Sequence, residues 1–141
     1  MTINQISVFV ENKFGRLNEI LSFLSKENIR IVAATVADTT EYGILRLITT
    51  NQHKAFQLLK AQGISANLSD VLAIKTDPSA GKLSETVEIF TKAGISIEYM
   101  YCFSDKSNGV VIIRPNNMDA AHEVIRRNSL NCLVESELSE L

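Results

Sequence analysis

The stretch that decides the fold is Val10-Glu11-Asn12-Lys13-Phe14-Gly15-Arg16-Leu17. Before it, residues 6–10 have the period of two that is typical of a half-buried strand. After it, residues 17–24 carry Leu and Ile at the spacing of one helix face. The stretch is therefore a tight strand-to-helix turn. Gly15 lets the backbone approach a ligand, and the free amides of the first helical turn attract a negative group, so the turn can hold a carboxylate.

The same pattern recurs 66 residues later in the chain. That shift places Gly15 on Gly81 and Leu17 on Leu83, and no gap is needed from Ser7 to Ala66. The apolar pattern follows the same shift, because residues 45–47 fall on 111–113. The sequence is thus an internal duplication, which predicts two domains, residues 1–69 and 70–141. The other identical pairs are Glu19 and Glu85, Lys26 and Lys92, Ile29 and Ile95, Ile31 and Ile97, Gly43 and Gly109, Asn51 and Asn117, and Ala55 and Ala121.

Each unit is predicted to have the order β-α-β-β-α-β. Asn51 and Asn117 are expected to cap the second helix of each unit, and Gly63 and Gly94 to end helices. The predicted strands are 5–11, 29–37, 44–49 and 65–69 in the first unit and 71–77, 95–103, 109–114 and 131–136 in the second. The predicted helices are 15–27, 51–62, 81–93 and 117–128, and turns are expected at 38–43 and 105–109.

This order predicts an α+β fold of two tandem ferredoxin-like βαββαβ units, with antiparallel sheets and helices on one face. A sheet whose other face meets water should alternate between apolar and polar residues. Residues 110–113 are apolar at four consecutive positions, and residues 44–48 are apolar on both sides of Arg46. We therefore expect a second copy to cover that face, giving a homodimer with eight strands in each chain.

Composition narrows the functional class. The chain has 141 residues and a net charge of −2, which gives no electrostatic reason to expect nucleic acid or an anionic membrane as a partner. No apolar run could span a bilayer, and residues 1–5 do not form a signal peptide. Cys102 and Cys132 lack metal-ligand spacing, so we expect no metal and no cofactor, a cytoplasmic location, and a core position for Cys102.

Other classes with this strand order are disfavoured. No Walker-type phosphate loop, dinucleotide fingerprint or nucleophile elbow occurs, so we expect no catalysis. Acylphosphatases use an arginine near the first strand–helix loop, which makes Arg16 a parallel, but their glycine-rich loop is missing. RNA-recognition motifs stack bases on aromatic side chains, which residues 44–48 and 110–113 lack. A metal-carrying ferredoxin-like domain needs paired cysteines in the first loop, and neither loop has any.

Two explanations of the glycine loops remain. Gly15 and Gly81 could merely permit a tight turn against the sheet. The first loop, however, resembles that of ACT domains, which are small amino-acid-sensing modules. Asn12, Gly15 and Leu17 match the family pattern, while Phe14 replaces its usual proline. Asp77, Gly81 and Leu83 resemble the pattern more loosely, with Pro78 and Ala80 at positions where the family prefers Asn or Asp and Pro.

The resemblance implies that an amino acid binds between two ACT units. The strand–helix loop of one unit would give backbone amides to the ligand carboxylate, and the start of the neighbour's second strand would contact the rest. The first site implied in this way comprises Asn12, Lys13, Phe14, Gly15, Arg16 and Leu17 with Ser96, Ile97 and Glu98. The second possible site comprises Asp77, Ser79, Ala80, Gly81, Lys82 and Leu83 with Arg30, Ile31 and Val32. The first has the better chemistry, because Glu98 can face an ammonium that Arg30 would repel.

The resulting hypothesis is a non-catalytic sensor that binds a free amino acid and acts on a metabolic enzyme or through its own dimer. Phe14, Tyr99 and Tyr101 place aromatic surface near the first site, which favours a bulky, aromatic or imidazole-bearing amino acid. The alternative is an assembly module, or a subunit of a separate amino-acid-metabolism enzyme, without a ligand site of its own.

Overall fold

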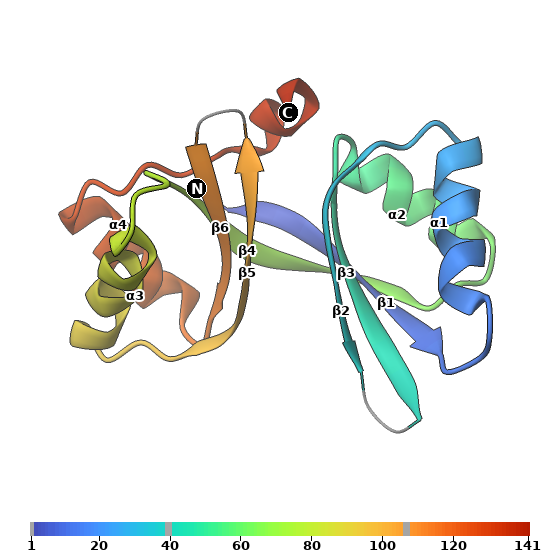
Figure 1. Cartoon of the computed structure of the whole chain (residues 1–141), viewed down its shortest axis with the longest axis horizontal. Coiled ribbons are helices and arrows are strands. Elements are labelled where there is room, and N and C mark those ends of the chain that lie inside the picture. The colour runs from blue at the N-terminus through green and yellow to red at the C-terminus, as the bar shows by residue number, and fades with distance from the viewer. Residues whose placement is uncertain (1, 39–40, 106–107) are drawn as a thin grey trace. The chain divides into compact units, whose positions relative to one another are not determined.

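The computed structural model describes residues 2–38, 41–105 and 108–141, and it shows the order βαββα twice along the chain, with β4 ending the first repeat and beginning the second (Figure 1). The fold is α+β, with two tandem ferredoxin-like units as the sequence predicts. The elements are β1 (Ile3–Glu11), α1 (Arg16–Lys26), β2 (Ile31–Asp38), β3 (Tyr42–Thr49), α2 (Gln52–Ala61), β4 (Ala66–Thr76), α3 (Lys82–Lys92), β5 (Ile97–Asp105), β6 (Asn108–Pro115), α4 (Met118–Arg127) and the 3-10 helix η1 (Glu135–Glu140).

The chain divides into two compact units, one of Asn4–Ser69 with Ser136–Leu141 and the other of Asp70–Glu135 with the residues before Asn4. In the first unit, which we call the N-terminal unit, β3 lies between β2 and β1 in an antiparallel sheet. The chain just before β4 lies on the other side of β1, where the Phe9 amide donates to the Ser65 carbonyl at 3.0 Å. Strand β2 is therefore an edge of this sheet.

The C-terminal unit repeats this arrangement, with β6 between β5 and β4. On the other side of β4, the Lys75 amide donates to the Asn131 carbonyl at 2.8 Å. Residues 75 and 131 lie 66 positions after Phe9 and Ser65, so the duplication extends to individual hydrogen bonds. Strand β5 is the matching edge.

Helices cover one face of each sheet. In the N-terminal unit, Val8 and Leu47 pack in one core with Leu24 of α1 and Leu59 of α2. In the C-terminal unit, the core joins the equivalent residues Ile74, Ile113, Phe90 and Ile125. All eight side chains are at most 2% exposed, which places α1 and α2 on one face of their sheet, and α3 and α4 likewise.

The prediction of eight strands is wrong, because the described residues form six. The predicted strands 65–69 and 71–77 are one continuous strand, β4, since Asp70 continues the extended chain. The predicted strand 131–136 is reduced to a single bridge between Ile74 and Cys132, and η1 begins at Glu135. The predicted turns include residues 39–40 and 106–107, which lie outside the described residues.

The apolar runs in β3 and β6 were expected to be covered by a second copy, but most of their residues are already buried in the single chain. Ile48 and Ile112 are both 0% exposed in the single chain, and Val110 is 1% exposed. These residues therefore give no reason to expect a second copy. They lie outside the two helix-covered cores, on strand positions that alternate with core residues such as Val111 and Ile113. A homodimer stays a prediction that must rest on other features.

None of the helices among the described residues has the length and apolar character needed to cross a membrane.

Candidate functional site

The first strand–helix loop joins β1 to α1 and turns at Gly15. Gly15 has φ +81° and ψ −5°, in the left-handed region that strains a side chain. The Arg16 amide donates to the Lys13 carbonyl at 3.1 Å, and the Glu19 amide donates to the Gly15 carbonyl at 3.0 Å. Helix α1 therefore begins directly after Gly15, and the amides of its first turn lie beside the loop.

The second loop joins β4 to α3 with the same backbone. Gly81 has φ +89° and ψ −14°. The Lys82 amide donates to the Ser79 carbonyl at 3.3 Å, and the Glu85 amide donates to the Gly81 carbonyl at 2.9 Å. The glycine and the three other residues that make these hydrogen bonds in each loop are related by the 66-residue shift, so the two loops are structural copies.

The helices of each unit begin in two different ways. Asn51 caps α2 by accepting from the Lys54 amide at 3.1 Å, and Asn117 caps α4 by accepting from the Ala120 amide at 3.0 Å, as predicted. In contrast, no described side chain caps α1 or α3. Because the second and third amides of a helix have no acceptor within the helix, those of residues 17–18 and 83–84 can serve an anion.

The side chains of the first loop are mostly exposed, and its charges form local pairs. The Lys13 ammonium lies 2.8 Å from the Glu11 carboxylate, and the Arg16 guanidinium lies 3.2 Å from that of Glu19. The hydrogen bond from Lys13 lowers the pKa of Glu11, and the same contact raises the pKa of Lys13. The predicted residues all lie in the loop or the first turn of α1, namely Asn12, Lys13, Phe14, Gly15, Arg16 and Leu17.

The second loop replaces the Lys13 pair with a turn. The Asp77 Oδ1 atom accepts from the Ser79 amide at 2.8 Å and from the Ser79 hydroxyl. These bonds from Ser79 are the main reason that the pKa of Asp77 is lowered. Lys82 lies 3.1 Å from Glu85, which repeats the Arg16 pair. The predicted residues Asp77, Ser79, Ala80, Gly81, Lys82 and Leu83 are all exposed.

Phe14 distinguishes the two loops most clearly. Its side chain is fully exposed, at 107% of the reference area, and the equivalent residue is Ala80. Phe14 lines a shallow cavity of about 370 Å³ with Glu11, Lys13, Arg16 and Glu19. An exposed aromatic ring beside two cations and two carboxylates suits a ligand that has both charges and an apolar part.

The predicted edge-strand residues lie where β5 and β2 begin. The Ser96 amide donates to the Asn116 Oδ1 atom at 3.1 Å, and the Asn116 amide donates to the Ser96 carbonyl at 2.9 Å. The pairing of β5 with β6 shifts between Ile97 and Tyr99, so Glu98 lies in a bulge. Its carboxylate lies 3.9 Å from the Arg114 guanidinium and is therefore partly engaged.

The N-terminal unit has the same irregularity. The Thr50 amide donates to the Arg30 carbonyl at 3.1 Å, and the pairing shifts between Ile31 and Ala33 around Val32. Bulges turn a side chain away from the regular alternation and often occur beside functional sites. Each predicted site joins a loop of one unit to the edge strand of the other, and each of these parts is formed within its own unit.

Both loops also border a pocket inside their own unit that the sequence analysis missed. The pocket in the N-terminal unit has a volume of about 180 Å³ and is lined by residues 10–13, Leu17, Val36 and Gly43. The pocket in the C-terminal unit measures about 300 Å³ and is lined by residues 76–79, Leu83, 102–104 and 109–111. Every residue that lines the smaller pocket has its 66-residue equivalent in the larger one. In the sequence, the identical glycines Gly43 and Gly109 could have pointed to these pockets, because each lines one of them.

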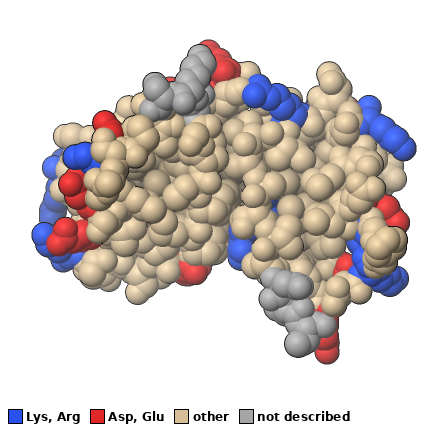
Figure 2. Space-filling model, viewed as in Figure 1, with Lys and Arg blue, Asp and Glu red and all other residues tan. Residues whose placement is uncertain are grey.

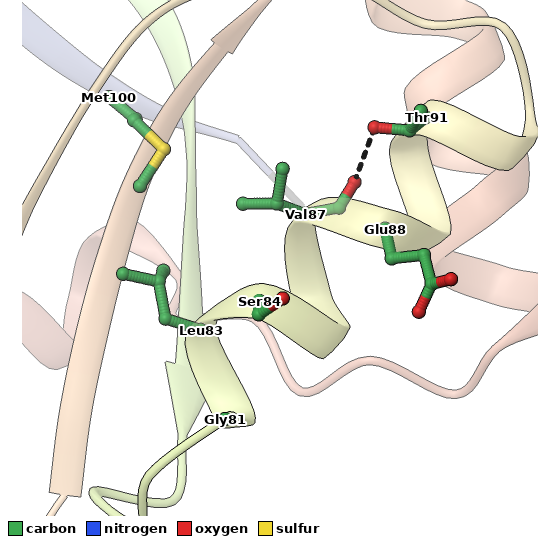
Figure 3. Close-up of a pocket in the computed structure, with 7 residues that line it drawn as sticks. All are labelled: Gly81, Leu83, Ser84, Val87, Glu88, Thr91 and Met100. Carbon is green, nitrogen blue, oxygen red and sulfur yellow. Dashed lines mark hydrogen bonds between the residues drawn. The ribbon is translucent and has the colours of Figure 1, made fainter.

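A fourth cavity, of about 810 Å³, follows α3 beside β5 (Figure 3). The side chains of Leu83, Val87 and Met100 point toward one another across it, whereas the Glu88 carboxylate points away. The Thr91 hydroxyl donates to the Val87 carbonyl at 3.1 Å and so does not face the cavity with a free donor. The groove is therefore apolar where the helix meets the edge strand.

The two cysteines, Cys102 and Cys132, are both free thiols. Cys102 lies in β5 as predicted, but it is exposed and not a core residue, because β5 is an edge strand. Partial desolvation raises the pKa of the Cys102 thiol, and burial raises that of Cys132. No group of three or more His, Cys, Asp or Glu side chains that could hold a metal occurs in the described part of the chain. In Figure 2, acidic and basic side chains are intermixed along the rim, without a large patch of one sign.

A model of the ACT domain pair matches residues 1–141, the whole chain. The chain belongs to the ACT domain pair family. ACT domains are regulatory domains of an amino-acid-binding fold family. The chain is 38% identical to protein BT0572 from Bacteroides thetaiotaomicron, whose crystal structure matches 100% of this chain and 98% of that one with a TM-score of 0.93.

The fold is also similar to that of the ligand-free regulatory subunit of aspartate kinase from Thermus thermophilus. That match has 13% identity and a TM-score of 0.57, and it covers 88% of this chain and 90% of the subunit. The corresponding subunit from Thermus flavus gives 14% identity, the same TM-score of 0.57 and the same coverage. At these identities the likeness concerns the fold alone. No curated protein sequence matches the chain.

Proposed function

We propose that this protein is a non-catalytic sensor that binds a free amino acid through the strand–helix loops of its ACT units, residues 1–69 and 70–141. Ligand binding would then act allosterically on a separate metabolic enzyme or on a homodimer of this chain. Aspartate kinase regulatory subunits, which share the fold, are regulators of such an enzyme. In this proposal the protein works in the cytoplasm, where its two free cysteines remain reduced.

The observation that carries the proposal is the repeated glycine at an uncapped helix start. The described chain has three pairs of equivalent positions with positive φ. At two of them one repeat uses a residue with a Cβ, namely Asn28 opposite Gly94 and Ser129 opposite Gly63. Of these three pairs, the loop pair, Gly15 and Gly81, is the one that is glycine in both repeats. A positive φ alone therefore does not account for glycine at both loops.

Crowding within the protein does not account for it either. A Cβ built at Gly15 or Gly81 has no heavy atom within 4 Å. A ligand that must approach the backbone closely would account for both glycines, because a carboxylate held by helix amides lies within hydrogen-bond distance of them. The first-turn amides of α1 and α3, which no described side chain caps, supply the donors for such a carboxylate.

The first loop is proposed as the better site. Its ligand would contact Asn12, Lys13, Phe14, Gly15, Arg16 and Leu17, with Ser96, Ile97 and Glu98 from a neighbouring edge strand. Glu98 would accept from the ligand ammonium, and the exposed ring of Phe14 favours a bulky, aromatic or imidazole-bearing side chain. The second loop, with Arg30, Ile31 and Val32 opposite, would form the pseudo-symmetric site.

A thermal-shift screen against the twenty amino acids tests the proposal, because a ligand that binds only the folded state raises its stability. Isothermal calorimetry would then measure the best ligand on Gly15→Asn and Gly81→Asn. Asparagine tolerates positive φ, as Asn28 shows at φ +59°, so these variants should fold while carrying a Cβ at the loop. We expect Gly15→Asn to lose binding and Gly81→Asn to retain much of it. Full retention in both would leave the glycines as simple turn residues, and no stabilisation by any amino acid would favour an assembly module.

A further inference from the structure

We infer that the pocket beneath the second loop holds the ammonium group of an amino acid with an apolar side chain, with Asp77 as the acceptor. This inference deepens the proposed function and rests on it, because it assigns a ligand class to the second loop. It requires only residues of the C-terminal unit. It also makes the two loops chemically different, since the first has no free carboxylate at the equivalent position.

The pocket has an apolar wall and a polar mouth. Its volume of about 300 Å³ is enclosed by four parts of the unit, namely the loop at 76–79, α3 at Leu83, β5 at 102–104 and β6 at 109–111. Leu83 and Val111 supply apolar side chains on the helix-covered side of the sheet, while Asp77 and Ser79 lie on the loop. Pockets for small molecules typically combine such apolar walls with a few placed polar groups.

The Oδ2 atom of Asp77 is available to accept a hydrogen bond from a ligand. Its Oδ1 atom accepts both hydrogen bonds from Ser79, which hold the carboxylate in place. None of the other described residues donates to Oδ2. A carboxylate fixed through one oxygen and free at the other is suited to accept from an ammonium group, since charge-assisted hydrogen bonds are the stronger kind.

No cationic side chain lines the described part of this pocket. Lys82 acts on Asp77 through its charge, but its ammonium lies 3.1 Å from the carboxylate of Glu85, its own partner. The charge of Asp77 is therefore not matched within the pocket lining. A ligand ammonium would supply the missing positive charge.

The pocket in the N-terminal unit is the natural contrast. Glu11 stands at the position of Asp77, but the Lys13 ammonium lies 2.8 Å from its carboxylate, and both residues line that pocket. Ser79 replaces Lys13 in the second repeat. The smaller pocket, of about 180 Å³, thus already contains its cation. Glu11→Gln is therefore a matched control for Asp77→Asn.

Cys102 provides a direct measurement, because its exposed thiol lines the larger pocket. With Cys132 replaced by Ser, the rate of Cys102 alkylation by iodoacetamide at pH 8 reports whether the pocket is occupied. The probes are leucine and phenylalanine, with 4-methylpentanoate and 3-phenylpropanoate as the same skeletons without the amine. At ten times Kd we expect one of the amino acids to slow alkylation about tenfold, following mass action. The acids should have little effect.

Asp77→Asn should abolish this protection, while Glu11→Gln should retain it. The inference is overturned if neither amino acid protects Cys102, if the amine-free acids protect equally well, or if Asp77→Asn is protected like the parent. A thermal-shift measurement on the same samples separates the two proposals. Stabilisation by an amino acid without protection of Cys102 leaves the proposed function standing and refutes the pocket assignment. Absence of stabilisation by all twenty amino acids refutes both.

Discussion

Alanine at Gly15 should separate backbone strain from ligand contact when it is compared with alanine at Gly94. Gly15 and Gly94 have φ +81° and +73°, and a Cβ at either position meets no heavy atom within 4 Å. Each substitution therefore adds only left-handed strain of about 1–2 kcal/mol. Alanine also lowers the conformational entropy of the unfolded chain, which offsets about 0.4–1 kcal/mol of this strain. The net cost is about 1 kcal/mol in both variants, which lowers Tm by about 2–5 °C for a chain of this size.

Binding should respond to only one of the two substitutions. If the first-turn amides of α1 hold a carboxylate, a Cβ at position 15 stands in the path of that ligand. Loss of one hydrogen bond to a charged group costs about 1.5–3 kcal/mol, equivalent to a ten- to hundredfold weaker Kd. Gly94 follows α3 at its carboxyl end, away from the helix start, so alanine there should leave Kd unchanged.

The assay combines thermal melts followed by circular dichroism with calorimetric titration of the best amino acid from the screen. Equal melting temperatures in the two variants with a selective loss of binding in Gly15→Ala is the expected result. Equal affinities for Gly15→Ala and the parent would refute carboxylate capture at this loop. An equal loss of affinity in Gly94→Ala would show that strain alone weakens binding.

Three further substitutions test other features. Ile112→Lys places a charge at a position that is 0% exposed, so it should destabilise the chain by about 3–5 kcal/mol. If light scattering instead shows a well-folded monomer with an unchanged Tm, Ile112 lies at a dimer interface. Phe14→Ser removes a fully exposed ring, so Tm should change little while calorimetry shows weaker binding of aromatic amino acids, and unchanged affinity would exclude Phe14 from the site. The pKa of Asp77 is lowered in the folded state, so its contribution to stability is present above the unfolded pKa, near 4, and is lost as pH falls through the lower folded pKa. Tm of Asp77→Asn should accordingly fall less than that of the parent between pH 5 and pH 2, and parallel acid profiles would contradict this.

The sequence predicted the features that local chemistry determines. The Asn51 and Asn117 caps, the turns at Gly15 and Gly81, and the repeated strand–helix order all follow from short-range patterns, and the structure confirms them. The 66-residue shift was especially informative. It predicted equivalences that extend to the pairs Phe9–Ser65 and Lys75–Asn131.

The remaining features depend on tertiary context. A single residue, Asp70, could not show whether two predicted strands are separate or form one long β4. The unbroken apolar run in β6 could not distinguish burial within the chain from burial by a second copy, and Ile112 is already buried in the single chain. Cys102 was placed in the core because it falls in a predicted strand, but its exposure depends on β5 being an edge strand. The loop pockets were missed because their walls come from four separate segments.

The backbone amide spectrum recorded during an amino-acid titration tests the central claim most directly. A ligand carboxylate held at a strand–helix loop should shift the amide resonances of residues 15–18, of residues 81–84, or of both sets. The Lys54 and Ala120 amides, which Asn51 and Asn117 already cap, serve as internal controls and should remain in place. Saturable shifts confined to the uncapped starts of α1 and α3 are the predicted result. Unchanged amides at both loops under saturating ligand would contradict amino-acid binding at these sites.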